Sequence, residues 1–89
     1  MKTLVFKINL CTMGSTAFIF NEDGTFDSYP IDEAGGHVAE RLAQLAFSKG
    51  VDKIVLSGAG NCYCRPIKDE IEVYSKTYYK NYNVEVEIA

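Results

Sequence analysis

Residues 51–61 read VDKIVLSGAGN, and this stretch decides the fold class. The short apolar run at residues 54–56 is typical of a central parallel strand. Gly58 and Gly60 interrupt the run, and apolar side chains then recur at helical spacing beyond Pro66. A buried strand, a glycine turn and an amphipathic helix together indicate an α/β domain.

The segments on either side of this stretch predict two helices and a last strand. The first helix has a start signal at Asp32 and a stop signal at Gly50. The second is expected from Pro66 to about Tyr82, and residues 83–88 then alternate as a strand does. The apolar face of the first helix is formed by Val38, Leu42, Leu45 and Ala46. The residues of the second helix expected to face the sheet are Ile67, Ile71, Tyr74 and Tyr78.

Three strands are expected before the first helix. Residues 3–10 alternate between apolar and polar side chains, which predicts a strand with one buried face. Residues 16–20 are rich in aromatic and β-branched side chains, and the turn sequence NEDG at 21–24 predicts a hairpin. Residues 25–31 form the third strand, in which Pro30 marks an edge or an end.

The predicted order of elements is therefore β-β-β-α-β-α-β, in a single domain over residues 1–89. Right-handed crossovers give the strand order 3-2-1-4-5 in a mixed five-stranded sheet, with both helices on one face. We therefore predict a two-layer α/β fold. The face without helices is expected to carry Val5, Lys7, Asn9, Ala17, Ile19, Val55, Ser57, Glu85 and Glu87.

Composition restricts the class of protein without naming its function. The chain is 47% hydrophobic and 24% charged, which is the balance of a folded soluble domain. No apolar run approaches the ~18 residues of a membrane span, so we expect no membrane contact. The formal net charge of −3 argues against a protein that holds nucleic acid by bulk positive charge, and we do not expect nucleic acid as a partner.

The N-terminus and the cysteines indicate a cytoplasmic protein. The first ten residues, MKTLVFKINL, lack the apolar core and the cleavage site of a signal peptide. The three cysteines are an odd number, whereas secreted disulfide scaffolds more often have four, six or eight. We therefore expect reduced thiols.

The predicted order of elements resembles the core of the ribonuclease H-like fold, which nucleases, resolvases and each half of the actin-like ATPases share. The likeness is sharpest over residues 51–88. There the strand, the glycine step, the helix and the short last strand resemble the adenosine-binding segment of actin-like ATPases and sugar kinases. The resemblance implies a single half-domain of that group, with a nucleotide site at the glycines.

Two departures from these families bear on activity. Nucleases of this fold hold divalent metal with a carboxylate in the middle of the first strand, where this chain has Lys7 and Asn9. The fourth strand ends at Ser57 without an acid, and Glu40 alone matches a metal-binding position, so a two-metal site is incomplete. The phosphate turn of the ATPases begins with Asp, which Asn9 replaces here. We therefore expect neither a nuclease nor a monomeric ATPase.

One edge of the predicted sheet is the expected ligand site. The C-terminal ends of the parallel strands meet there, and both helix N-termini point at it with partial positive charge. We expect a phosphate or carboxylate ligand, with ATP as one alternative, although the glycines also suit plain turns. The residues expected to bind it are Thr12, Gly14, Ser15, Thr16, Gly36, Gly58, Gly60 and Asn61.

The same edge gathers Cys11, His37, Cys62 and Cys64. Three thiolates and an imidazole suit structural zinc, although one residue between Cys62 and Cys64 is tighter than the usual spacing. A redox pair, or thiols that only pack, are the other interpretations. We expect no resident cofactor, with zinc as the alternative. No motif ties a nucleophile to His37, so no catalytic residue is predicted.

Two functions remain open from the sequence. The first is a small non-enzymatic binding module, an accessory or virus-encoded factor such as a phage protein, that acts through protein contacts and forms a homodimer. Its interface is expected at Val5, Ile19 and Val55 on the helix-free face, and at Tyr79. The second is a nucleotide- or phosphate-binding protein of the actin-like type.

Overall fold

The sheet and its two helices follow the predicted order closely. The computed structural model describes residues 1–8, 15–32, 37–58 and 61–89, apart from the side chains of residues 61–63. The elements in chain order are β1 (Thr3–Ile8), β2 (Ser15–Phe20), β3 (Phe26–Ile31), α1 (His37–Lys49), β4 (Lys53–Gly58), α2 (Asn61–Tyr78) and β5 (Glu85–Ile88).

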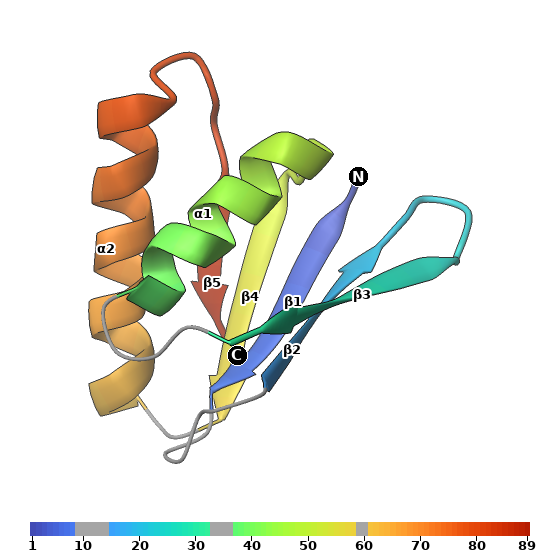
Figure 1. Cartoon of the computed structure of the whole chain (residues 1–89), viewed down its shortest axis with the longest axis horizontal. Helices are drawn as coiled ribbons and strands as arrows, with labels where there is room; N and C mark the ends of the chain where they lie inside the picture. Colours follow the sequence, from blue (N-terminus) through green and yellow to red (C-terminus); the bar gives the residue numbers. More distant parts are fainter. Residues whose placement is uncertain (9–14, 33–36, 59–60) are drawn as a thin grey trace.

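The sheet has the strand order β3-β2-β1-β4-β5, as predicted (Figure 1). The first three strands form an antiparallel meander, and β4 and β5 each add in parallel to the neighbouring strand. Pro30 lies on β3, an edge strand, where its missing N–H costs no ladder bond. The mixed two-layer α/β architecture is therefore confirmed.

Both helices pack on one face of the sheet and close a single core. The buried side of the three central strands contributes Leu4, Phe6, Ala17, Ile19, Ile54 and Leu56. One apolar stripe of α1 covers them, and Ile71 of α2 reaches the same cluster. Neither of the described helices covers the opposite face of the sheet, as predicted, and we call this the helix-free face.

The register of β2 corrects one prediction. Ala17 and Ile19 were expected on the helix-free face, but they are 0% and 2% exposed and belong to the core. Their cross-strand partners on β1 are Phe6 and Leu4, which face the helices. Both sides of β2 are apolar, so alternation alone does not tell which side is buried. The residues of β2 on the helix-free face are Phe18 and Phe20 instead.

The bounds of α2 differ from the prediction. Helix α1 spans His37–Lys49, and residues 33–36, which separate it from the predicted start signal at Asp32, fall outside the described residues. Helix α2 begins at Asn61, five residues earlier than predicted, and therefore contains Pro66 inside it. Tyr78 was expected to face the sheet, but it is 65% exposed at the end of α2. None of the described helices is long and apolar enough to cross a membrane.

The hairpin turn between β2 and β3 is held by its own side chains. The Asp23 carboxylate accepts hydrogen bonds from the backbone N–H of Thr25 at 3.0 Å and from its hydroxyl at 2.6 Å. These bonds favour the charged carboxylate, the side-chain bond most strongly, and so hold the pKa of Asp23 below its ordinary value. Figure 1 shows the hairpin reaching away from both helices. The predicted turn at residues 21–24 is therefore confirmed.

Candidate functional site

The parallel strands β1 and β4 end side by side, and we call this place the strand-end edge. Gly58, the last residue of β4, pairs with Ile8 and has a positive φ of 87°. A Cβ atom on Gly58 would lie 2.3 Å from the carbonyl oxygen of Ile8 and 3.1 Å from Cγ of Lys7. Only glycine fits this position, so the glycine at the end of β4 has a steric cause that needs no ligand.

The residues predicted to bind an anion lie partly at this strand-end edge. Gly58 is exposed there and Asn61 begins α2, whereas Ser15 is buried and Thr16 is half-buried at the start of β2. The remaining four, Thr12, Gly14, Gly36 and Gly60, fall outside the described residues. The anion site therefore stays a prediction.

The predicted metal ligands have different environments. Cys64 is 1% exposed inside the core, and its Sγ donates to the carbonyl oxygen of Gly58 at 3.8 Å. His37 is exposed at the start of α1, with Nδ1 3.8 Å from a carboxylate oxygen of Glu40. Cys11 and the side chain of Cys62 fall outside the described residues. Over the described parts of the chain, no three His, Cys, Asp or Glu side chains come together as metal ligands.

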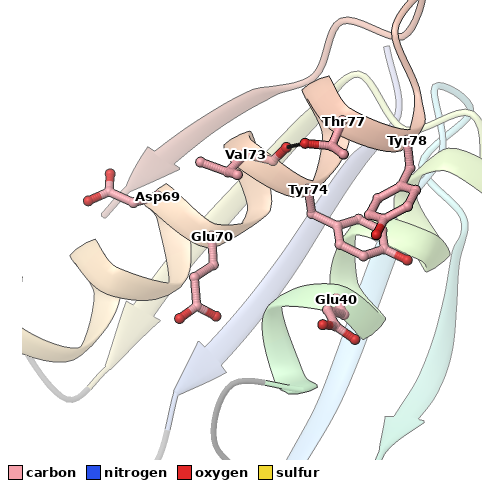
Figure 2. A pocket seen from close by; sticks show the side chains of 7 residues that line it. All are labelled: Glu40, Asp69, Glu70, Val73, Tyr74, Thr77 and Tyr78. Carbon is pink, nitrogen blue, oxygen red and sulfur yellow. Dashed lines mark hydrogen bonds between the residues drawn. The ribbon is translucent and has the colours of Figure 1, made fainter.

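A groove of about 460 Å³ lies between α1 and α2 (Figure 2). Figure 2 shows the rings of Tyr74 and Tyr78 pointing from α2 toward α1, with Asp69 directed away from them. The two ring centroids are 4.5 Å apart, and the Tyr74 hydroxyl accepts a hydrogen bond from Gln44 on α1 at 3.0 Å. Glu40 of α1 also lines the groove. The groove therefore combines negative charge with aromatic surface, a character that repels phosphate.

The helix-free face carries a second feature that the sequence analysis missed. Phe18, Phe20 and Phe26 are 37%, 42% and 58% exposed, and all three lie on this face of β2 and β3. The Phe26 ring centroid lies 6.0 Å from that of Phe18 and 5.6 Å from that of Phe20. We call these three rings the aromatic platform. The sequence did hold a signal for it, because Phe20 and Phe26 flank the hairpin turn symmetrically and therefore pair across it.

Charged residues on β1, β4 and β5 lie on the same face as the aromatic platform. Lys7 is exposed on β1, beside the strand-end edge. Glu85 and Glu87 lie on β5, at the opposite edge of the sheet. Lys53 contacts Glu87, with Nζ 2.5 Å from the carboxylate oxygen, and this contact raises the pKa of the Lys53 ammonium.

The predicted interface residues divide among three environments. Val5 and Val55 pair directly on the helix-free face and are half-buried there. Ile19 is in the core, as described above, so it cannot contribute to an interface of the folded chain. Tyr79 stacks on Phe47 of α1, with ring centroids 3.9 Å apart and planes within 7°. Its ring is therefore engaged within the chain.

Comparison with known proteins bears on the fold of the chain. No protein-family model and no curated protein matches the sequence. Among solved structures, the chain is similar to the Fowlpox virus resolvase, determined in complex with its substrate Holliday junction DNA. The TM-score is 0.59 at 18% sequence identity, and the match covers 100% of this chain and 60% of the resolvase chain. At this identity the match establishes the fold.

Two functional predictions are corrected by the same match. The prediction of a non-enzymatic protein-contact module is contradicted, because the matched protein is a resolvase solved with its DNA substrate. The prediction that excluded nucleic acid as a partner is contradicted on the same ground. The resemblance to actin-like ATPases finds no support in the comparisons. With its mixed sheet in the order 3-2-1-4-5 and both helices on one face, the chain has the ribonuclease H-like fold.

Proposed function

We propose that this chain acts on nucleic acid and recognises branched DNA. The observation that carries the proposal is the match of the whole chain to a resolvase bound to a Holliday junction. The chain spans 60% of that resolvase, so the proposal concerns the shared part. That part consists of the five-stranded sheet and the two helices on one face of it.

The charge distribution favours the strand-end edge as the surface that contacts DNA. The net charge of −3 gives little general attraction to phosphate, so local positive charge has to position the DNA. The strand-end edge has Lys7 on β1 and Arg65 in the second turn of α2, both exposed. The first turn of α2 has no acidic residue, so its partial positive charge is not cancelled there. The acidic groove and the β5 edge repel phosphate.

The proposal commits to recognition of the branch point. Metal-dependent cleavage by this fold needs clustered carboxylates. Strands β1 and β4 carry no Asp or Glu over residues 3–8 and 53–58, and Glu40 on α1 is exposed beside His37. Binding of the branched substrate is therefore the step that the described residues support.

Fluorescence anisotropy with a labelled four-way DNA junction tests the proposal. A duplex of the same arm sequence is the competing ligand, at about 50 mM and about 150 mM salt. We expect tighter binding to the junction, and weaker binding of both at the higher salt. Lys7→Gln should lower the affinity several-fold, whereas Lys80→Gln, a matched loss of an exposed cation after the far end of α2, should not. Absence of binding to either DNA at the lower salt refutes the proposal.

A further inference from the structure

The aromatic platform gathers the exposed large apolar side chains of the described strands. Its three phenyl rings lie on the helix-free face of β2 and β3 and touch each other through Phe26. They contribute nothing to the core, which is closed on the opposite face by Ala17 and Ile19 of the same strand β2. Large exposed rings gathered on one surface of a soluble domain usually mark a binding site.

The surroundings of the platform match a nucleic acid strand. On the same face, Thr3 is the cross-strand partner of Phe20 and Ser28 is the partner of Phe18, so the rings are bordered by hydrogen-bonding groups. Lys7 lies on the neighbouring strand β1, within the same face, where a phosphate next to a stacked base can meet it.

The two acidic groups of the hairpin turn beside the platform already have partners. In the hairpin turn, Glu22 contacts the N-terminal amine of Met1, and Asp23 accepts two hydrogen bonds from Thr25. On β5, which lies three strands away from β2, the carboxylate of Glu87 contacts Lys53. Lys7, on the strand next to β2, therefore lies closer to the aromatic platform than Glu85 and Glu87, which lie on the far edge strand β5.

We infer that the aromatic platform binds unpaired nucleobases by stacking them on Phe18, Phe20 and Phe26. This inference rests on the proposed function and names the part of the DNA that this face takes, the unstacked bases at a branch point or in a single strand. Bases stack on aromatic side chains without regard to sequence, because every base presents a π-face. The platform would therefore prefer unpaired bases over paired ones, without regard to which base is present.

The test measures binding of a labelled oligothymidylate by the whole chain and by point variants. Phe26→Ala should weaken binding roughly 5- to 100-fold, the range for loss of one base-stacking ring. Phe26→Leu should weaken it as well, because the branched side chain keeps apolar area but has no π-face. Val73→Ala, which shortens an equally exposed apolar residue on α2, should bind as the wild type does.

The salt dependence separates stacking from phosphate contact. The Phe26 variants should keep the wild-type slope of log affinity against log salt concentration, because no phosphate contact is lost. Lys7→Gln should reduce that slope by about 0.7 for a single strand. In spectra of the wild-type chain, the ring resonances of Phe18 and Phe26 should shift when the oligonucleotide is added. This last measurement does not depend on the folding of any variant.

The outcomes distinguish this inference from the proposed function and from self-association. If the junction binds and the phenylalanine variants bind as the wild type does, the platform is not the site, while the proposed function stands. If no DNA binds at all, both fail. Light scattering that gives twice 9.9 kDa for the wild type and 9.9 kDa for Phe26→Ala, with unchanged DNA affinity, would assign the face to a second copy of the chain and overturn the inference.

Discussion

Replacement of Gly58 by alanine tests how the strand-end edge is built. Gly58 combines a φ of 87° with a backbone neighbour, the carbonyl oxygen of Ile8, only 2.3 Å from where Cβ would be. That oxygen belongs to the parallel ladder of β1 and β4, so it cannot move away as a flexible side chain would. Gly24 in the β2–β3 turn is a matched control, because it has the same φ of 87° and nothing within 4 Å of its would-be Cβ.

Both substitutions carry the cost of a left-handed backbone, and only Gly58→Ala also carries the cost of a close contact. A left-handed backbone costs an alanine about 1–2 kcal/mol, and both variants should show this loss. The contact with Ile8 adds an overpacking cost of about 1–3 kcal/mol in Gly58→Ala only. The free energy of unfolding of a domain of 89 residues is about 4–13 kcal/mol, so both variants should still fold under mild conditions.

Urea unfolding followed by circular dichroism measures the difference. With a dependence of about 1 kcal/mol per M urea, the midpoints of the two variants should lie about 1–3 M apart, with Gly58→Ala the lower. Equal midpoints would refute the reasoning, because they would mean that β1 and β4 separate at no cost. The tight approach of these strands would then not define the strand-end edge.

Two further substitutions test the packing. Tyr82→Phe removes the hydrogen bond that the Tyr82 hydroxyl donates to the carbonyl oxygen of Val51 at 2.5 Å, which should lower the free energy of unfolding by about 1 kcal/mol in urea titrations. Burial raises the pKa of Tyr82 from 10.0 to about 12, so the wild type should lose stability as the pH rises from 10.0 to about 12, and the variant should lose less; equal losses would contradict this. Ile19→Glu places a carboxylate in the core and should cost more than about 4 kcal/mol, enough to unfold the chain by circular dichroism, whereas Phe18→Glu on the exposed side of the same strand should remain folded. A folded Ile19→Glu variant would contradict the observed register of β2.

The sequence was sufficient for the topology because each step of it had a local signal. The hairpin turn fixed the first antiparallel pairs, and the buried run at residues 54–56 marked a central parallel strand. The handedness of crossover connections then left one strand order and one face for both helices. None of these signals needed information from distant side chains.

The register of β2 was not predictable in the same way. Residues 16–20 read TAFIF, so each face of the strand has two apolar side chains and alternation does not choose between them. The choice depends on volume and on partners across the sheet. Ala17 and Ile19 fit under α1 opposite Phe6 and Leu4, which leaves the larger phenylalanines on the open face. The predicted dimer interface at Ile19 failed for this reason, and the aromatic platform was missed with it.

The helix boundaries failed where local rules compete. Pro66 suits the first turn of a helix, which favoured a late start for α2, yet the helix begins at Asn61 and places Pro66 in its second turn. Packing of Cys64 into the core stabilises the added turn, which offsets the backbone hydrogen bond that proline cannot make. At this position the core contacts of α2 outweigh the unfavourable helix propensity of proline.

The predicted ligand site depended on the directions of side chains in space, which the sequence alone does not determine. Cys64 and His37 are both near helix starts, but one side chain is buried in the core and the other is exposed beside Glu40. A list of residue types at one edge of a sheet does not state which of them point toward each other. The charge argument against nucleic acid failed for a related reason, since net charge averages over surfaces of opposite character.

Competition for a labelled four-way junction tests the central claim most directly. The chain is first bound to the junction, and unlabelled junction or unlabelled duplex of the same arm sequence is then added at equal nucleotide concentration. Recognition of branched DNA predicts that the unlabelled junction displaces the label at a concentration at least about tenfold below that of the duplex, a difference of about 1.4 kcal/mol. Equal displacement by junction and duplex, or no complex to displace, would contradict the claim.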